Sequence, residues 1–414
     1  MKALILNTSD FDGGADRAAY RLHQGLRFIG IDSTMLVQER SKDDGSIIGP
    51  QSKLEQTLNK SRPLLDTLPI RLYGHRQNVI FTPAALPSRI PHSVRKHDPD
   101  VVHMHWVGRG FLNVETISRM KRPMVWTLHD MWAFTGGCHY DQECGRYERS
   151  CGACPILGSS RERDLSRWIW HRKQRAYRAA PLTIVTPSRW LGDCAKKSAL
   201  LKDIRVEVIP NGLDMSRYRP VEKNLARDLL GLPQNKRIIL FGALASTSDP
   251  RKGFQHLQAA LVEMGKQGWG ERAELALLGS SAPKVAPDLG LPAHYMGRFS
   301  DDISLVLMYS AADVFVAPSV QENLANTVME ALACGTPCVA FDIGGMPDLI
   351  DHGVTGYLAQ PYSARDLAEG IAWVLADDER RAKLAYEARA KAKRDYHLPM
   401  IAHRHRQLYE EILQ

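Results

Sequence analysis

The chain alternates short apolar runs with longer amphipathic ones, and it does so in two separate series. In the first series, an apolar run at residues 3–7 precedes a glycine-containing turn and an amphipathic segment at 16–30. Such alternation predicts strands followed by helices, and hence a mostly parallel sheet with helices on both faces. The further strands predicted in this series are residues 33–38, 101–106, 123–128, 182–187 and 205–210. In residues 41–98 the apolar residues are spaced less regularly, and we predict loops and helices there.

A second series of the same kind begins after residue 220. Its predicted strands are residues 237–243, 273–279, 313–319 and 337–342, and its predicted helices are residues 253–264, 302–312, 326–335, 366–377 and 380–396. A chain of 414 residues exceeds the usual size of one domain. We therefore predict an α/β protein with two doubly wound domains, residues 1–212 and 213–396, that face each other across a cleft.

The composition indicates a soluble globular protein, with 44% hydrophobic and 24% charged residues. No stretch approaches the roughly 18 apolar residues of a spanning helix, and the N-terminus lacks the pattern of a signal peptide, so we expect a cytoplasmic protein. The net charge of +8 favours anionic partners, such as a phosphate-bearing substrate or an anionic membrane surface. Because no RNA- or DNA-binding signature is present, a nucleic-acid partner is not expected.

Two glutamates mark the most informative stretch of the second series. Glu322 lies in the loop between a predicted strand that ends near Pro318 and a predicted helix, and Glu330 lies inside that helix. Loops at the carboxyl ends of parallel strands bind ligands, and helix N-termini present free N–H groups there. The amides of residues 323–325 and the two carboxylates could therefore bind a polyhydroxylated ligand. Alone, such a pair of glutamates would more often be two solvated surface charges.

The pair is not isolated. PS-x-x-E followed by MEALACGTPCVA resembles the donor-binding signature of family 4 of the retaining GT-B glycosyltransferases. Segments that resemble other motifs of that family lie at residues 11–22, 127–130, 208–214, 251–257 and 296–302. The resemblance implies two Rossmann-like domains, with residues 397–414 packing back on the N-terminal, acceptor-side domain. It also implies transfer of a hexose from a nucleotide-diphosphate-sugar to a saccharide or lipid-linked saccharide, in bacterial surface polysaccharide synthesis at the inner face of the membrane.

The resemblance assigns roles residue by residue. Three residues carry the catalytic roles: His129 lies near the transferred sugar, Lys252 neutralises charge on the diphosphate, and Glu322 binds hydroxyls of the donor sugar. The remaining donor-binding residues are Gly13 and Gly14 in a loop that approaches the phosphates, Arg298 and Phe299 in the segment that holds the base, Asn323, Leu324 and Ala325 through their amides, and Glu330 at the ribose.

The chain departs from the family pattern in two places. Many members carry Gly-Arg where this chain has Gly242-Ala243, so Arg251 either supplies the second cation or is a surface residue. Residues 323–325 replace the family's small glycines, so the donor's identity cannot be carried over. No Asp-x-Asp pair is placed to bridge a divalent metal and a diphosphate, so no cofactor is expected to be required for catalysis. Two alternatives stay open: a GT-B nucleotide-sugar epimerase, and a non-catalytic subunit that binds nucleotide-sugar.

Four cysteines crowd into one short segment: Cys138, Cys144, Cys151 and Cys154. Four thiolates could bind a structural zinc ion in tetrahedral geometry, but the spacing is not that of a standard finger. Free thiols in a reducing compartment, and a redox role, are the alternatives.

The segment at residues 164–180 mixes tryptophan and tyrosine with many basic residues. It predicts either a helix that rests on an anionic membrane or a domain helix that buries its aromatic side chains and leaves its arginines in water. We expect the histidines of the last segment, His403 and His405, to lie on the surface.

Overall fold

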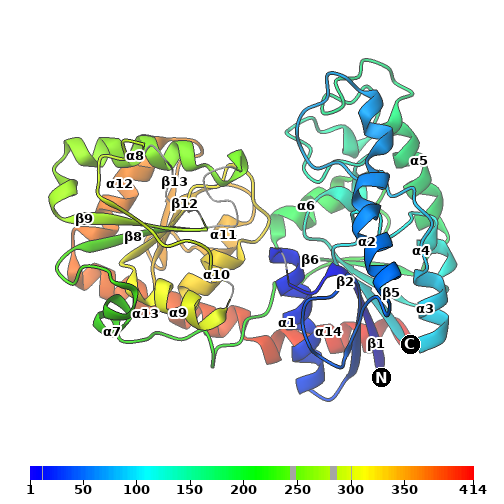
Figure 1. Ribbon diagram of the computed structural model, residues 1–414, viewed down its shortest axis with the longest axis horizontal. Helices are drawn as coiled ribbons and strands as arrows, with labels where there is room; N and C mark the ends of the chain where they lie inside the picture. Colours follow the sequence, from blue (N-terminus) through cyan, green and yellow to red (C-terminus); the bar gives the residue numbers. More distant parts are fainter. Residues whose placement is uncertain (12, 243–248, 280–286, 300) are drawn as a thin grey trace. The chain divides into compact units, whose positions relative to one another are not determined.

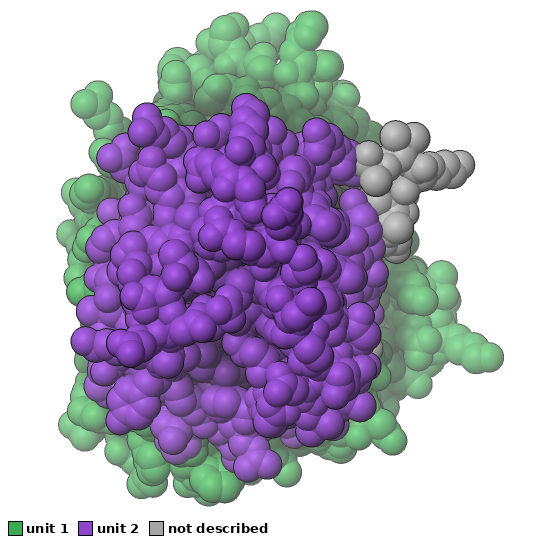
Figure 2. Space-filling view, turned by 90° about the vertical axis from the view of Figure 1, so that its left-hand side faces the viewer, with its two compact units in different colours: residues 1–210, 399–414 green, residues 211–398 purple. Residues whose placement is uncertain are grey.

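The computed structural model describes residues 1–11, 13–242, 249–279, 287–299 and 301–414. They form two compact units, coloured separately in Figure 2: a first unit of residues 1–210 and 399–414, and a second unit of residues 211–398. The two segments at which the chain passes between the units are joined by hydrogen bonds. The N–H of Leu213 donates to the carbonyl of Tyr396 at 2.8 Å, and the N–H of Leu398 donates to the carbonyl of Leu213 at 3.0 Å.

The first unit contains a seven-stranded sheet in the order β3-β2-β1-β4-β5-β6-β7. Every strand pair in it is parallel, so all carboxyl ends meet at one edge. Its strands are β1 (Lys2–Ser9), β2 (Asp32–Glu39), β3 (Ile47–Ile48), β4 (Val101–Met104), β5 (Met124–Thr127), β6 (Leu182–Thr186) and β7 (Val206–Val208). Its α-helices are α1 (Gly14–Phe28), α2 (Lys53–Asp66), α3 (Ile90–His97), α4 (Thr116–Arg119), α5 (Leu165–Arg178), α6 (Arg189–Lys197) and α14 (Leu398–Leu413).

The second unit contains a six-stranded parallel sheet in the order β10-β9-β8-β11-β12-β13. Its strands are β8 (Arg237–Gly242), β9 (Ala273–Leu278), β10 (Ala293–Tyr295), β11 (Val314–Ala317), β12 (Cys338–Phe341) and β13 (Gly356–Ala359). Its α-helices are α7 (Lys223–Leu230), α8 (Phe254–Lys266), α9 (Asp302–Ala311), α10 (Asn326–Ala333), α11 (Met346–Leu349), α12 (Ala364–Leu375) and α13 (Asp378–Tyr396). Figure 1 shows α8 and α12 on one side of this sheet and α9, α10 and α13 on the other. The predicted α/β class with two parallel sheets is confirmed.

Both faces of each sheet are buried, as the continuous apolar runs of the strands predict. Successive residues of β1 illustrate this, because Leu4 and Ile5 belong to clusters on opposite faces. Helix α14 packs in the same cluster as Ile5, through Ile401, Ala402 and Tyr409. Within the described residues, none of the helices combines the length and apolarity that crossing a bilayer requires.

One prediction for the last helix is wrong. His403 is exposed as expected, but His405 is only 2% exposed and its ring centroid lies 5.2 Å from that of His103. His405 is four residues after Ile401 and four before Tyr409, so it shares the buried face of α14 with them.

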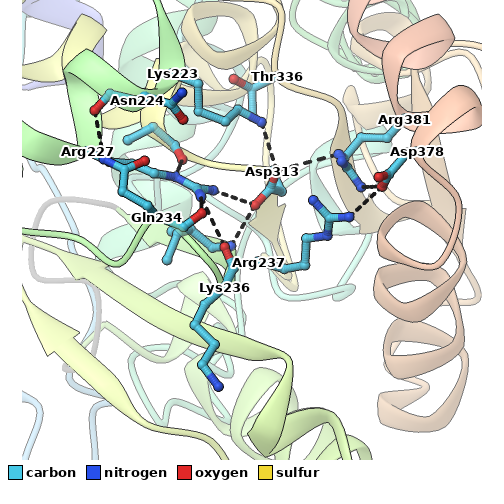
Figure 3. Close-up of polar contacts among 12 residues, drawn as sticks. Lys223, Asn224, Arg227, Gln234, Lys236, Arg237, Asp313, Thr336, Asp378 and Arg381 are labelled. Carbon is cyan, nitrogen blue, oxygen red and sulfur yellow. Dashed lines mark hydrogen bonds and ion pairs between the residues drawn. The ribbon is translucent and has the colours of Figure 1, made fainter.

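A buried carboxylate anchors two helices of the second unit at the amino-terminal end of its sheet. Asp313 directly precedes β11 and is 1% exposed. Its oxygens lie 2.7 Å from the Lys223 and Arg227 side-chain nitrogens and 3.4 Å from Arg381 Nε (Figure 3). Burial opposes ionisation of this carboxyl, but the Lys223 and Arg227 charges hold its pKa below the usual range. These ion pairs fix α7 and α13 to the sheet, at the end opposite to the loops described next.

Candidate functional site

Three loops of the second unit meet at the carboxyl ends of adjacent parallel strands β8, β11 and β12. The N–H of Val320, after β11, donates to the carbonyl of Arg251, after β8, at 2.9 Å. The N–H of Gly345, after β12, donates to the carbonyl of Glu322 at 3.2 Å. Backbone hydrogen bonds therefore fix the positions of the main-chain atoms from which the side chains of residues 251–252 and 322 extend.

Two glycines make this close contact possible. Gly253 has a φ of +70°, and a Cβ atom there would lie 1.8 Å from the carbonyl oxygen of Pro318. Gly344 has a φ of +52°, and a Cβ atom there would lie 2.1 Å from the carbonyl oxygen of Glu322. Both positions combine a left-handed backbone with a contact that no side chain fits, so each requires glycine.

Lys252 and Glu322, both predicted to be catalytic, form an ion pair. Lys252 Nζ donates to Glu322 Oε2 at 2.7 Å. The two side chains are 28% and 13% exposed, so the pair stands at the surface of the second unit, where a ligand can reach it. A cation and a carboxylate side by side can bind a phosphate and a hydroxyl group of one ligand.

The other residues predicted around Glu322 are largely buried. Asn323, Leu324 and Ala325 are 3%, 7% and 7% exposed, and they lead directly into α10. Glu330, in the second turn of α10, is 2% exposed, and its Oε2 accepts a hydrogen bond from the Tyr309 hydroxyl at 2.9 Å. Its assignment to the ribose stays a prediction.

In the second unit, the three remaining residues predicted for the donor site differ in their surroundings. The Arg251 guanidinium pairs with Asp249, with 2.7 Å between Nη2 and Oδ2. Arg298 is exposed, and Phe299 packs against the core of the second unit. Ala243, which stands where many family members have arginine, lies outside the described residues.

In the first unit, the glycine loop is held by Asp16. The N–H of Gly13 donates to Asp16 Oδ2 at 2.9 Å, and Asn7 Nδ2 donates to Asp16 Oδ1 at 2.5 Å. Gly14 begins α1 and is exposed. Gly13 is thus the N-cap residue of α1, and its N–H is satisfied by Asp16, whereas Gly14 is exposed.

His129 follows β5 and contacts a second histidine that follows β4. His105 Nδ1 and His129 Nε2 lie 3.0 Å apart, and the two rings are stacked. His105 is 3% exposed, whereas His129 is partly exposed. Burial lowers the pKa of His129 to about 4, despite the opposing charge of Asp130, so both rings are neutral at pH 7.

Asp130, next to His129, is the centre of a buried network. Its Oδ2 lies 2.7 Å from His139 Nδ1 and accepts from Trp106 Nε1 at 2.8 Å, and its Oδ1 accepts from the Trp132 N–H at 2.8 Å. His139 directly follows Cys138, so the cysteine-containing segment is tied to the His-Asp pair through this ring.

Helix α5 holds the backbone that follows His129. Its Lys173 is fully buried and donates to the carbonyls of Trp132 and Thr135. Arg172 is 4% exposed and forms an ion pair with Glu115 at 2.6 Å. Trp170 and Tyr177 are buried, and Trp168 is 47% exposed. Most aromatic side chains of α5 are thus buried in the first unit, as expected for a helix that is part of the domain. The expectation that its arginines stay in water is wrong for Arg172.

The four clustered cysteines lie in the segment between β5 and α5. All four are free, and three of them are buried. Among the described residues, no three His, Cys, Asp or Glu side chains are placed to share one metal ion. Burial raises the pKa of Cys138, Cys151 and Cys154, so without a metal ion these side chains are thiols at neutral pH. Zinc binding by the four cysteines stays a prediction.

Sequence reasoning missed four residues of these arrangements: His105, His139, Gly253 and Gly344. His105 and His129 each follow a strand of one parallel sheet, which was a usable signal. A glycine directly after Lys252, and the Gly344-Gly345 pair after a strand, were signals for close backbone contacts. Nothing in the sequence singles out His139.

Comparison with known proteins identifies the family. The model of the glycosyl transferases group 1 matches residues 223–391, and the model of Glycosyltransferase Family 4 matches residues 12–217. The D-inositol 3-phosphate glycosyltransferase of Nocardia farcinica is 26% identical over 310 residues, 71% of this chain and 62% of that protein. The alpha-maltose-1-phosphate synthase of Mycolicibacterium smegmatis is 27% identical over 271 residues, 60% of this chain and 67% of that protein. The match to the first of these relatives thus spans less than two thirds of its length.

Solved structures share the fold over the full length. Sucrose-phosphate synthase from Thermosynechococcus elongatus matches with a TM-score of 0.71 and 20% identity, over 100% of this chain and 99% of that one. Anabaena HepE in complex with UDP matches with a TM-score of 0.63 and 19% identity, over 99% of this chain and 100% of that one. The two family models divide the chain between them much as the two units do, and together with the shared fold they show that this chain belongs to the GT-B glycosyltransferases of family 4.

Proposed function

We propose that the chain transfers a hexose, with retention of anomeric configuration and without a metal ion, from a nucleotide-diphosphate-sugar to a saccharide or lipid-linked saccharide. The observation that carries the proposal is the Lys252–Glu322 ion pair at the carboxyl edge of the second sheet. Family membership supports the reaction class, and structures of a HepE protein with UDP and with UDP-glucose support this kind of donor.

In the proposed reaction, the bond between the sugar C1 and the diphosphate oxygen breaks while the acceptor oxygen bonds to C1 on the same face. The acceptor's proton passes to the departing phosphate. Lys252 would stabilise the negative charge that develops on that phosphate, and such electrostatic stabilisation is usually the largest contribution of a site like this. Glu322 would leave Lys252 and accept hydrogen bonds from the sugar hydroxyls.

In this proposal, the lysine of the Lys252–Glu322 ion pair also explains why the reaction needs no metal ion. Lys252 supplies a positive charge where metal-dependent transferases place a divalent cation. His129, neutral at pH 7, could contact a sugar hydroxyl as donor or acceptor without adding a charge.

The test is a binding and transfer screen with purified protein. Thermal shift with UDP-, GDP- and ADP-sugars, and with a CMP-sugar as a donor that lacks the diphosphate, identifies the nucleotide. Transfer of a labelled sugar to lipid-linked or free saccharide acceptors then tests the reaction. Isomerised donor without any acceptor would instead indicate an epimerase, and donor binding with neither reaction would indicate a non-catalytic subunit.

The proposal places the protein in the cytoplasm, at the inner face of the membrane, where lipid-linked acceptors of bacterial surface polysaccharides reside. The net charge of +8 suits an anionic surface. Fractionation of cells tests the location: the protein should sediment with membranes at low salt and be released by high salt.

A further inference from the structure

Helix α2 turns its apolar side away from its own unit. Leu54, Leu58 and Leu65 stand at positions i, i+4 and i+11, so they share one face of the helix. Their exposed fractions are 70%, 52% and 44%. A surface helix of a globular protein normally buries such a face and exposes its polar residues. Helix α2 has the opposite orientation, because its leucine side chains are exposed.

Polar side chains hold α2 in this orientation. Asn59 Nδ2 donates to the carbonyl of Gln38 at 2.9 Å, and Arg62 Nε donates to the carbonyl of Gly110 at 2.8 Å. The Asp66 carboxylate, 2% exposed, accepts from the N–H of Ala84 and of Ala85 at 3.3 and 3.1 Å. Turning the leucines inward would break all of these hydrogen bonds, so the exposure of the leucines is a fixed property of the unit.

Further large hydrophobic side chains are exposed in α2 and in the segment after it. They are Leu64 (55%) in the helix, and Leu68 (45%), Leu72 (86%), Val79 (39%) and Ile80 (52%) after it. We call these five residues, with Leu54, Leu58 and Leu65, the leucine face. Figure 1 shows α2 as a blue helix in front of the sheet of the first unit. So many exposed large apolar side chains within one stretch of chain indicate an interaction site.

The charges around the leucine face are positive. Lys53, Lys60 and Arg71 are exposed, and among the described residues no ion pair joins any of the three to a carboxylate. The only carboxylates within residues 51–80 are those of Glu55, which pairs with Arg89 at 3.3 Å, and of the buried Asp66. Leucines flanked by unpaired cations are typical of segments that lie in the interface of an anionic bilayer.

We propose that the leucine face docks on an anionic lipid membrane, which deepens the proposed function by naming the surface that would bring the enzyme to a membrane-bound acceptor. The leucines would enter the boundary between headgroups and acyl chains, and Lys53, Lys60 and Arg71 would lie among anionic headgroups. A second copy of the chain fits less well, because a two-fold contact of this face would bring its lysines close to one another.

The experiment is co-sedimentation of the full-length chain with vesicles, which requires neither donor nor acceptor. Vesicles of equal parts phosphatidylglycerol and phosphatidylcholine are compared with vesicles of phosphatidylcholine alone. The test variant is Leu58→Glu with Leu65→Glu. The matched control is Leu225→Glu with Leu229→Glu, two leucines of α7 in the second unit with exposed fractions of 51% and 64%. A third variant, Lys53→Gln with Lys60→Gln, tests the charges.

We expect the wild-type chain and the α7 control to bind the anionic vesicles, and the α2 variant to bind at least about tenfold more weakly. The lysine variant should lose part of the binding, and phosphatidylcholine vesicles should bind weakly. All variants should keep the wild-type melting temperature, and nucleotide-sugar thermal shifts on the same samples report the proposed function separately. Equal vesicle binding by the α2 variant and the wild type would overturn the proposal. A concentration-dependent dimer that only the α2 variant loses would overturn it in favour of a second copy.

Discussion

The Nζ atom of Lys252 lies 2.7 Å from Oε2 of Glu322, although the two residues are 70 positions apart in the sequence. Two backbone hydrogen bonds and two glycines bring their loops together, so the pair is positioned by the fold and not only by mutual attraction. In the free protein each side chain partly compensates the other's charge. A donor that brings a diphosphate and sugar hydroxyls would replace both partners at once.

Gly253→Ala should disrupt this arrangement. Its Cβ would lie 1.8 Å from the Pro318 carbonyl oxygen, so the loop that carries Lys252 must move away from the loop that carries Glu322. The matched control is Gly231→Ala, because Gly231 has a nearly equal φ of +67° but no atom within 4 Å of its added Cβ. We expect the control to cost about 1 kcal/mol of folding free energy and to keep donor affinity, measured by calorimetry. Equal donor affinity in both variants would show that the close contact does not position the site.

His105 should determine which nitrogen of His129 carries the proton. Among the described residues, His105 Nε2 is buried without a hydrogen-bond partner. Because a buried N–H without an acceptor is rarer than an unused lone pair, His105 should carry its proton on Nδ1 and donate it to His129 Nε2. His129 would then be protonated on Nδ1. Long-range ¹H–¹⁵N spectra of histidine-labelled protein read this tautomer directly, and protonation of His129 on Nε2 would refute the assignment.

Two variants separate this effect from a loss of packing. His105→Asn keeps an amide near the position of Nδ1, whereas His105→Leu keeps apolar volume and removes the hydrogen bond. We expect the leucine variant to give a mixture of His129 tautomers, and the asparagine variant to restore a single one. Identical spectra for the two variants would mean that His105 acts only by packing.

Acid should destabilise the protein before its carboxylates titrate. Five histidines have a pKa lowered chiefly by burial, namely His23, His103, His105, His129 and His405. Each folded pKa lies below the unfolded value, so the unfolded chain binds more protons between the two values and stability rises with pH in that range. The pKa of His23 and of His129 is about 4. The free energy of unfolding should therefore fall by roughly 1.5 kcal/mol for each of these two histidines between about pH 6.5 and pH 5, and the other three should add to the fall.

Denaturant unfolding over that pH range measures this fall. His23→Gln, which removes one of the five rings from α1, should reduce the pH dependence by about one proton. His403→Gln is the control, because His403 is exposed on α14. A free energy of unfolding that stays flat from about pH 6.5 to pH 5 would contradict the burial of these rings as neutral groups.

The sequence allowed prediction of those helices and strands in which apolar and polar residues follow a regular pattern. Alternating apolar runs located the central strands of both sheets, and the resemblance to family motifs singled out Glu322, Glu330 and Lys252 as candidate site residues. Strands β3, β10 and β13 were missed; all three are short and lie at an edge of their sheet. Such strands depend on the one neighbouring strand more than on their own sequence.

Other features could not be predicted because they depend on partners distant in the sequence. The leucines of α2 would be expected to face the core, and only the partners of Asn59, Arg62 and Asp66 reveal the opposite. Lys173 is buried because two carbonyls and the Trp132 ring surround it. The spacing of the four cysteines permitted a zinc site but did not demand one.

A chelator should leave the proposed activity unchanged, because Lys252 and not a divalent cation would stabilise the leaving diphosphate. The measurement is the rate of sugar transfer before and after treatment with excess chelator, with circular dichroism as a control for the fold. A loss of transfer that added magnesium or manganese restores would contradict the metal-independent reaction.

The central claim is that Lys252 stabilises the departing diphosphate, and single-turnover transfer by Lys252→Ala tests it most directly. The charge of Lys252 matters most as the bond to the sugar breaks, so the rate of transfer should fall by about 100-fold or more while donor affinity changes by less than about tenfold. Lys266→Ala, at a side chain that is 71% exposed on α8, serves as the control and should transfer at the wild-type rate. A Lys252→Ala protein that binds donor more weakly but transfers sugar at the wild-type rate once saturated would contradict the account.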